Sequence, residues 1–429
     1  LKPAAASKLI ATLREETDLP IHFHTHDTSG VASATVLAAV EAGVDCVDAA
    51  MDAFSGTTSQ PCLGSLVAAL KGGERDPGFD AKTIREISFY WEAVRAQYRA
   101  FESDLRSGAS EVYLHEMPGG QFTNLKEQAR SLGLQSRWHE VAQTYADVNQ
   151  MFGDIVKVTP SSKVVGDMAL SMVSSGLSRQ DVEDPEREVA FPESVVGFFA
   201  GDLGQPPGGF PKELQAKVLK GRKPMDKRPG AYLEPADIEA ARQEVAKELE
   251  MEIDDFQLAS YLMYPKVFVE FMRAQAIYGP TSVLPTPVYF YGLGDGDELM
   301  VDLSKGFTLV LRYLGRAETN AKGMVRVFFE LNGQPRSVFV PDRHMAGEII
   351  VRAKAEEGNA KQVGAPMPGV VSTLAVKTGQ QVTAGDVLLS IEAMKMETAI
   401  HCEVDGVVVE ILAQPGDQVD AKDLLVRIE

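Results

Sequence analysis

The chain has 429 residues, 24% of them charged, and its excess of acidic over basic residues gives a formal net charge of -19. That length predicts two or three domains with hydrophobic cores, while the negative charge argues against nucleic acid or an anionic membrane surface as the main partner, because either would repel the chain at long range. No apolar run approaches the roughly 18 residues that span a bilayer, and the three cysteines have no paired spacing that would indicate disulfides or a zinc ribbon.

Helix and strand alternate in the first part of the chain. A helix end is followed by a strand at 20–27, a helix at 31–42, a second strand at 44–50 and another helix. Strands separated by short helices predict a parallel sheet, as in a barrel or a doubly wound fold. Two strands are too few to close an eight-stranded barrel, so we expect the chain to be a fragment with most of the sheet upstream of Leu1. Targeting signals cannot be read from a fragment.

Three histidines alternate along the first predicted strand, in PIHFHTHDTSG. His22, His24 and His26 are two residues apart, so on a strand they share one face. Neutral imidazoles grouped in this way are typical ligands of zinc or a similar divalent ion, whereas a single strand histidine is more often a packed core residue. Two ligands from one strand leave positions for other groups and for substrate, as a catalytic metal requires.

Helical periodicity dominates residues 81–175, with interruptions at MPGG (117–120) and at VTPSS (158–162). In the second interruption, Thr159 is placed to cap a helix that begins at Pro160, where cap and first-turn residues of these types are common. We therefore expect a helical extension after the parallel sheet.

The next part of the chain changes from helix to strand. A loop-rich stretch at 201–214 leads to two clear helical segments, 238–249 and 256–276. From about Thr281 the segments VYFYGL, TLVLRYLG, MVRVFFELNG and RSVFV predict strands, with Asn332-Gly333 as a hairpin turn. A charged segment at 347–362 then has the composition of a solvated linker.

The last part of the chain contains an internal repeat. Residues 369–392 and 406–429 align as two 24-residue copies with 11 identities. Each copy holds short alternating strands broken at a glycine turn, so the two copies predict a flattened β sandwich with approximate twofold symmetry. Lys395 lies in the connection between them, in EAMKMETAI. A lysine on a protruding turn has a flexible stem and an amine that can be acylated, which suits a group carried between sites.

Several of these motifs resemble those of biotin-dependent enzymes. APMPG (365–369) with AMKM (393–396) resembles a biotinyl domain, in which Lys395 would be biotinylated; related lipoyl domains usually have Asp-Lys-Ala there. HTHDTSG resembles the metal strand of the carboxyltransferase barrels, whose two histidines, matching His24 and His26, bind an ion with an aspartate and a carbamylated lysine that we expect before Leu1. His22 has no role in that pattern and is expected to be structural or to support the ligands.

The segment VTPSSK, together with MPGGQFTNL (117–125), resembles the same carboxyltransferase family. The resemblance implies that Thr159 relays a proton between substrate and biotin, and that Ser162 and Lys163 hydrogen-bond the ureido group. The cap and the catalyst can be the same residue, because a helix start also supplies a partial positive field where negative charge is transferred.

Longer segments resemble the pyruvate carboxylases, namely PPGGFPKELQAKVLKG, YLMYPKVFVEF and LRYLGRAETNAKGMVRVFFELNG. The resemblance implies an α/β and β multidomain chain. Its expected parts are the C-terminal part of a TIM-type (β/α)8 barrel with a helical extension at 1–278, an allosteric and tetramerisation β domain at 279–346, the linker at 347–362 and a duplicated β-sandwich biotin carrier domain at 363–429.

The same resemblance implies carboxylation of pyruvate to oxaloacetate, with covalent biotin and with zinc or manganese as the metal. It also implies ATP and bicarbonate used by a biotin carboxylase domain upstream, a biotin protein ligase, acetyl-CoA as activator, a homotetramer, and a cytoplasmic or, in a eukaryote, mitochondrial matrix location. The alternatives are an oxaloacetate decarboxylase or transcarboxylase subunit, or a carrier and assembly module whose histidine strand is structural.

Overall fold

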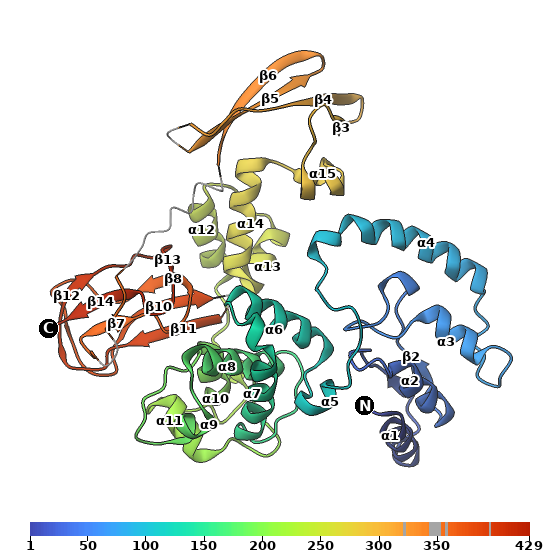
Figure 1. Ribbon diagram of the computed structural model, residues 1–429, viewed down its shortest axis with the longest axis horizontal. Helices are drawn as coiled ribbons and strands as arrows, with labels where there is room; N and C mark the ends of the chain where they lie inside the picture. Colours follow the sequence, from blue (N-terminus) through green and yellow to red (C-terminus); the bar gives the residue numbers. More distant parts are fainter. Residues whose placement is uncertain (321–322, 343–352, 357–358, 394–395) are drawn as a thin grey trace. The chain divides into compact units, whose positions relative to one another are not determined.

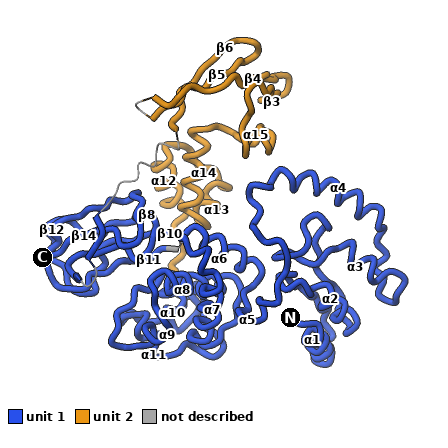
Figure 2. Tube along the Cα trace, viewed as in Figure 1, with its two compact units in different colours: residues 1–232, 352–429 blue, residues 233–351 orange. Residues whose placement is uncertain are grey.

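The computed structural model describes residues 1–429 except 321–322, 343–352, 357–358 and 394–395 (Figure 1). It divides into two compact units, residues 1–232 with 352–429 and residues 233–351 (Figure 2). Among the helices of the described residues, none is both long enough and apolar enough to cross a membrane.

The first segment of unit 1 is an α/β arrangement with a short parallel sheet. Its elements are α1 (Pro3–Glu16), β1 (His22–Phe23), α2 (Ala32–Glu41), β2 (Cys46–Val47), α3 (Leu63–Leu70) and α4 (Ala81–Gln97). β1 and β2 pair in parallel, as predicted, with Phe23 opposite Val47. Each is much shorter than its predicted strand, because within the described residues the two strands have only each other as hydrogen-bonding partners.

A cluster of seven helices follows, built around α8. The helices are α5 (Val112–His115), α6 (Gly119–Ser131), α7 (Trp138–Met151), α8 (Ser161–Ser175), α9 (Arg179–Glu183), α10 (Glu193–Ala200) and α11 (Lys212–Leu219). Residues 164–173 of α8 are all buried, because α6, α7 and α10 pack against it from different sides. A helix buried all round forms the core of the cluster and fixes the position of its own first turn.

Short 3-10 helices occur between these elements. They are η1 (Asp52–Phe54), η2 (Arg99–Phe101), η3 (Gln135–Arg137), η4 (Pro229–Ala231) and η5 (Thr281–Val283). η1 contacts the first turn of α3, where the Asp52 carboxylate accepts a hydrogen bond from Gly64 N at 2.8 Å.

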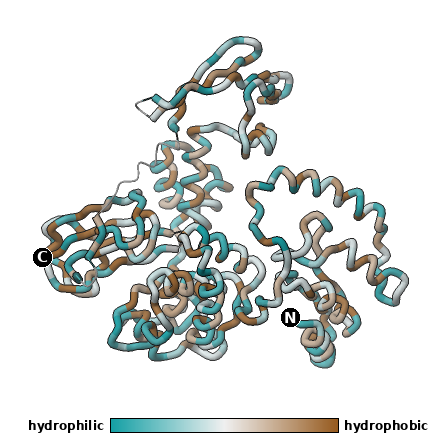
Figure 3. Tube along the Cα trace, in the orientation of Figure 1, coloured by the Kyte–Doolittle hydropathy of each residue, from teal (hydrophilic) through white to brown (hydrophobic). Residues whose placement is uncertain are grey.

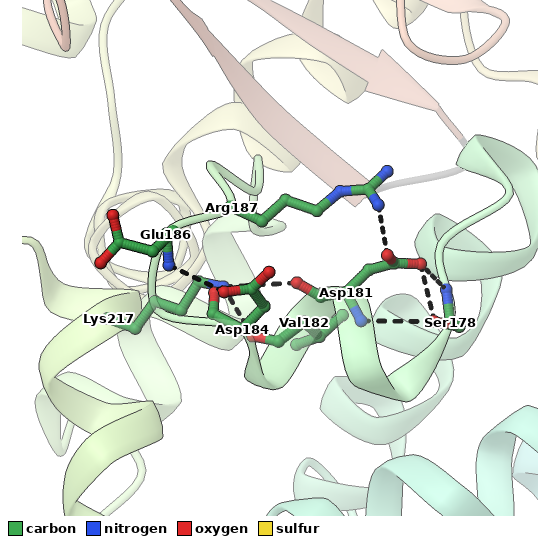
Figure 4. A network of polar contacts seen from close by, with 7 residues as sticks. All are labelled: Ser178, Asp181, Val182, Asp184, Glu186, Arg187 and Lys217. Atoms are coloured by element: carbon green, nitrogen blue, oxygen red, sulfur yellow. Dashed lines mark hydrogen bonds and ion pairs between the residues drawn. The ribbon is translucent and has the colours of Figure 1, made fainter.

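Polar contacts at both ends hold the five-residue helix α9 in place (Figure 4). Ser178 and Asp181 form a capping box at its start, and Arg187 pairs with Asp181. At the other end, Lys217 of α11 donates to the Val182 carbonyl at 2.7 Å. A helix this short has too few internal hydrogen bonds to be stable alone, so these caps account for its presence.

Unit 2 consists of helices followed by an antiparallel sheet. The helices are α12 (Ile238–Leu249), α13 (Asp255–Met263), α14 (Pro265–Tyr278) and α15 (Thr286–Tyr291), and the strands are β3 (Glu298–Ser304), β4 (Phe307–Arg316), β5 (Met324–Leu331) and β6 (Gln334–Pro341). The strands lie in chain order, β3-β4-β5-β6. The hairpin at Asn332-Gly333 is confirmed, with φ of 50 and 77 degrees at the two residues, as its turn type requires.

Two predictions in this region are wrong. The helix expected over 256–276 is two helices, because Pro265 lacks an N–H and begins α14 instead of continuing α13. The segment VYFYGL lies mostly in α15, not in a strand. Pro285 and Pro287 favour a helix start at its beginning, and a short aromatic run does not distinguish a strand from a helix by periodicity.

The last segment of unit 1 is the predicted β sandwich. Its strands are β7 (Gln362–Gly364), β8 (Gly369–Leu374), β9 (Gln381–Val382), β10 (Val387–Ala393), β11 (Met396–His401), β12 (Gly406–Ile411), β13 (Gln418–Val419) and β14 (Leu424–Ile428). They form two four-stranded sheets, β11-β10-β8-β13 and β7-β14-β12-β9. Hydrophobic and hydrophilic residues alternate over short distances in these strands (Figure 3), and the hydrophobic ones form a closed core.

The twofold symmetry of the sandwich follows the sequence repeat. β8, β9 and β10 begin at residues that align with the first residues of β12, β13 and β14. The short strand of each copy, β9 or β13, pairs with a long strand of the other copy. This exchange interlocks the two copies into one fold.

Equivalent glycines, Gly369 and Gly406, stand where a neighbouring segment of the sandwich approaches closely. A Cβ on Gly369 would lie 2.6 Å from Ile391 Cγ2, and a Cβ on Gly406 would lie 2.5 Å from the aligned Ile428 Cγ2. The identity of these two positions in the repeat therefore has a steric cause. Just before the sandwich, Lys354 Nζ lies 2.8 Å from Asp423 Oδ1, so part of the segment predicted as linker contacts the sandwich.

Candidate functional site

The histidine strand presents its imidazoles on the side opposite the core. Phe23 is buried, while His22 and His24 have side chains that are 57% and 53% exposed. After β1, the Asp27 carboxylate accepts a hydrogen bond at 2.9 Å from the backbone N of Ala32, the first residue of α2. The motif HTHD thus places its imidazoles directly before a helix start.

Asp48 holds two of the three histidines. His22 Nε2 lies 2.7 Å from Asp48 Oδ1, and His24 Nδ1 lies 2.6 Å from Asp48 Oδ2. The hydrogen bonds from His24 and then His22 keep the pKa of Asp48 below its ordinary value of 3.8. His22 therefore supports the site through Asp48, in keeping with its expected supporting or structural role.

Sequence reasoning missed Asp48, although the sequence contained a signal for it. Phe23 lies opposite Val47 in the parallel pair, so the residues that follow them, His24 and Asp48, lie side by side. A carboxylate at this position of a parallel partner strand could have been identified from the register alone.

The two predicted ligands face each other. His26 Nδ1 donates to the Thr58 carbonyl at 2.6 Å, and His24 Nδ1 donates to Asp48. In a neutral imidazole with a proton on Nδ1, Nε2 has a lone pair and no proton. His24 Nε2 and His26 Nε2 are 3.3 Å apart, so two acceptor atoms are in contact with no proton to share between them.

This arrangement fits a divalent cation between the two nitrogens. Two nitrogens, each about 2.0–2.1 Å from a tetrahedral zinc ion, are separated by about 3.3–3.4 Å. Hydrogen bonds from the other ring nitrogens to a carboxylate and a carbonyl are the usual support for metal-binding histidines. Within the described part of the chain, no cluster of three or more His, Cys, Asp or Glu residues is arranged to hold an ion, so His24 and His26 would supply only two of the ligands.

The MPGG segment packs directly against this pair. α6 begins at Gly119, and a Cβ added there would lie 2.7 Å from the Cγ and Nδ1 atoms of His26. Any other residue at 119 would displace the ring. The structure therefore brings together the histidine strand and the MPGG segment, two motifs far apart in the sequence.

The threonine loop differs from its prediction. α8 begins at Ser161, and Pro160 occupies the N-cap position without a side-chain cap. The predicted capping role of Thr159 is therefore wrong, because a proline separates it from the helix. Ser161 instead closes the loop, since its Oγ accepts from Val158 N at 3.1 Å and donates to the Val156 carbonyl at 2.8 Å. Thr159 is exposed, and its hydroxyl makes no hydrogen bond with the described residues.

Ser162 and Lys163 occupy the first turn of α8 in different surroundings. Ser162 is buried, and its carbonyl accepts a hydrogen bond from the Tyr145 hydroxyl at 3.5 Å. Lys163 is partly exposed and pairs with the buried Asp167 one turn further along α8. In the described part of the chain, neither His24 nor His26 is hydrogen-bonded to this loop.

Lys395, the predicted attachment point, lies outside the described residues. The strands on either side of it are described, and β10 pairs with β11 up to Ala393 opposite Met396. β10 ends at Ala393 and β11 begins at Met396, so both bounds lie in the connection between the copies of the repeat.

Three family models match the chain. "HMGL-like" matches residues 1–90, "Conserved carboxylase domain" matches residues 112–312 and "Biotin-requiring enzyme" matches residues 361–428. The first of these, with the carboxyl transferase structures below, indicates a TIM-barrel-type region in the N-terminal part.

Curated relatives match the chain along its length. The pyruvate carboxylase of Bacillus subtilis is 44% identical over 100% of this chain and 37% of its own length. The mitochondrial pyruvate carboxylase of Homo sapiens is 44% identical over 95% of this chain and 35% of its own length. The chain thus spans little more than a third of these relatives.

Solved structures agree with these relatives. The complete multifunctional pyruvate carboxylase of Rhizobium etli is 68% identical, covers 100% of this chain and 39% of its own, and superposes with a TM-score of 0.73. The carboxyl transferase domain of the same enzyme with pyruvate and biocytin is 70% identical, covers 80% of this chain and 58% of its own, and has a TM-score of 0.75.

Proposed function

The chain corresponds over its whole length to the C-terminal portion of the pyruvate carboxylases, and on that premise we propose that it supplies the biotin carrier and part of the carboxyltransferase site of an enzyme that carboxylates pyruvate to oxaloacetate. The observation that carries the proposal is the facing pair of Nε2 atoms on His24 and His26, 3.3 Å apart, in one chain with a duplicated carrier fold. The related carboxyl transferase domain has been solved with pyruvate and biocytin.

His24 and His26 hold a divalent ion, zinc or manganese, in this proposal. Asp48 and Thr58 fix the orientation and the tautomer of the two rings. When bound, such an ion polarises the carbonyl of a 2-oxo acid and stabilises the negative charge that develops when a methyl proton is removed. The remaining ligands come from parts of the enzyme not represented among these residues.

Thr159 moves a proton between the substrate and the biotin nitrogen. A threonine hydroxyl is a poor free base, so its contribution is positional, between two groups whose basicities match in the transition state. The exposed hydroxyl, free of hydrogen bonds to the described residues, is compatible with that role. Ser162 and Lys163 hydrogen-bond the ureido group, and the positive field at the start of α8 favours the charge transferred there.

Lys395 carries the biotin, which brings an activated carboxyl group to the carboxyltransferase site when it is carboxylated. A tethered domain keeps its cargo at high effective concentration near each site that it can reach. We assign the carrier to 363–429, consistent with the family match at 361–428, with the linker at 347–362, the allosteric and tetramerisation β domain at 279–346 and the carboxyltransferase part at 1–278.

The whole enzyme, in this proposal, contains a biotin carboxylase domain that uses ATP and bicarbonate. A biotin protein ligase modifies Lys395, acetyl-CoA activates the enzyme, and four subunits assemble. The enzyme is located in the cytoplasm of a bacterium or in the mitochondrial matrix of a eukaryote, in this proposal, which is supported by one bacterial relative and one relative named mitochondrial.

The test is oxaloacetate formation by the full-length protein from pyruvate, ATP and bicarbonate. We compare wild type with the double variant His24→Ala, His26→Ala and with Lys395→Arg, each checked for bound metal and for biotin. Activity should be lost in both variants, with metal lost only in the first and biotin only in the second. If the histidine variant keeps both its metal and its activity, the chain is a carrier module, and the proposed metal site at His24 and His26 is rejected. Oxaloacetate breakdown without ATP-dependent synthesis would indicate a decarboxylase.

A further inference from the structure

Asp167 is a charged side chain in the core of the helical cluster. It lies on α8 with 0% of its surface exposed. Burial raises the pKa of its carboxyl, and the nearby Lys163 ammonium and two hydrogen bonds oppose that rise. A carboxylate in such surroundings is unfavourable unless a cation and hydrogen-bond donors stabilise it.

Both partners of Asp167 reach the same carboxylate oxygen. Lys163 Nζ lies 2.5 Å from Oδ2, and Ser194 Oγ donates to Oδ2 at 2.6 Å. Lys163 is one turn earlier on α8, and Ser194 is in the first turn of α10. The other oxygen, Oδ1, is buried without a hydrogen-bond partner among the described residues. The described residues around Asp167 therefore do not supply all the hydrogen bonds that its carboxylate could accept.

Stability does not explain this ion pair. A buried ion pair is often no more stable than well-packed hydrophobic residues of similar volume, and the surrounding residues of α8 are all buried and mostly apolar. The pair does have a clear geometric effect. It holds the tip of a long side chain, 38% exposed, that could otherwise adopt many rotamers.

The backbone that carries this side chain is joined directly to the threonine loop. Lys163 is in the first turn of α8, four residues after Thr159, and its backbone N donates to the Pro160 carbonyl at 3.0 Å. Ser194 fixes Asp167 from a different helix, so the position of the ammonium depends on the packing of α10 against α8 as well as on α8 itself.

We propose that Asp167, held by Ser194, is a positioning residue for carboxyl transfer, and that it fixes the ammonium of Lys163, which lies in the first turn of the helix that follows the threonine loop. The role of Asp167 in the transfer step rests on the proposed function. Its effect on the position of the Lys163 ammonium does not. Asp167 is too buried to touch a substrate, so it acts only through Lys163.

A double-mutant cycle on the full-length biotinylated enzyme tests the transfer step. Asp167→Asn should lower kcat about tenfold, the usual effect of losing a charged hydrogen bond, with the KM for pyruvate unchanged. In a Lys163→Met background, Asp167→Asn should lower kcat no further. Equal factors in both backgrounds, or an unchanged kcat in the single variant, would overturn the proposal. As a matched control, Glu183→Gln removes the exposed pair Arg179–Glu183 of α9 and should leave kcat unchanged.

The position of the ammonium has a readout that does not need activity. Reductive methylation followed by peptide mass spectrometry measures the reactivity of each lysine. Lys163 should react about tenfold faster in Asp167→Asn than in wild type, while the exposed Lys82 of α4 keeps its rate. Ser194→Ala, which leaves the ion pair in place, should give a smaller change in the same direction and replaces Asp167→Asn if that variant does not fold. Unchanged labelling of Lys163 would reject the positioning role, whereas an inactive wild type with normal labelling shifts would reject only the proposed function.

Discussion

The carrier sandwich and the histidine strand place their chemistry in contrasting ways. In the sandwich every strand belongs to one of two four-stranded sheets, and core residues such as Leu388 and Leu425 are fully buried. In the described part of the chain, β1 and β2 have only each other, and His24 stays half exposed. A self-contained fold can carry its function on one side chain, whereas an open strand needs supporting contacts from distant segments.

The largest expected difference between the two regions is the effect on kcat of removing one threonine hydroxyl from each. Thr159→Val removes the proposed proton relay and should lower kcat for oxaloacetate formation by about 10²–10⁴-fold, because no neighbouring group replaces a positioned proton carrier. The same change at Thr378, on an exposed turn of the carrier sandwich, should leave kcat unchanged. Steady-state kinetics of the full-length enzyme measures both, and a Thr159→Val enzyme with wild-type kcat would remove Thr159 from the mechanism.

The next largest expected effect is on metal affinity, when the support that Asp48 gives to the histidines is removed. Asp48→Asn removes the negative charge that orients His24 and His22, and should weaken metal binding about 10–100-fold. Asp45→Asn is the matched control, because Asp45 pairs with Arg14 and not with a histidine. Titration of metal-stripped protein with zinc measures the affinities. Equal affinity in wild type and Asp48→Asn would show that the histidine pair needs no such support.

The sandwich should respond to changes in packing, and symmetrically. Gly369→Ala and Gly406→Ala each force a Cβ against backbone and an isoleucine, and should destabilise the sandwich by about 1–3 kcal/mol each. Gly120→Ala, on α6 with no atom within 4 Å of the added Cβ, should not destabilise. Hydrogen exchange of the β10 and β12 amides in the full chain reports the effect. If only one of the two glycines is sensitive, the repeat is not symmetric in its packing.

The smallest predicted effect is on pH dependence. His115 is buried, its Nδ1 accepts from Met117 N at 3.1 Å, and burial lowers its pKa below the ordinary 6.5, with Glu111 opposing. The unfolded chain therefore binds a proton as the pH falls through about 6.5, while the folded chain does not until lower pH, so stability is lost with acidification.

His115→Gln keeps an acceptor for Met117 N but does not titrate. Between about pH 7.5 and about pH 5.5, wild type should therefore lose about 1 kcal/mol more unfolding free energy than the variant. Denaturant unfolding of the helical cluster at the two pH values measures this difference. Parallel losses in the two proteins would contradict the buried neutral state of His115.

Local pattern predicted what is repeated or periodic in this chain. The two copies of the repeat allowed the sandwich and its twofold symmetry to be predicted, and the alternation of His22, His24 and His26 predicted their common face. The contacts between segments were not predictable in this way. Asp48 depends on the register of a parallel pair, and the packing of Gly119 on His26 depends on how α6 meets the strand.

The errors have local causes as well. Thr159 has a residue type that caps helices, but Pro160 takes the cap position and Ser161 makes the loop hydrogen bonds. The aromatic run in α15 has no decisive period over so few residues. In both places a proline determines where the helix begins, and the side-chain pattern alone led to a wrong prediction.

The most direct test of the account is peptide mass spectrometry of the full-length protein isolated from cells that contain a biotin protein ligase. The account predicts one biotinyl group on the peptide that contains Lys395, and none in Lys395→Arg. Protein that carries no biotin on that peptide, although the ligase modifies a known acceptor in the same cells, would contradict it.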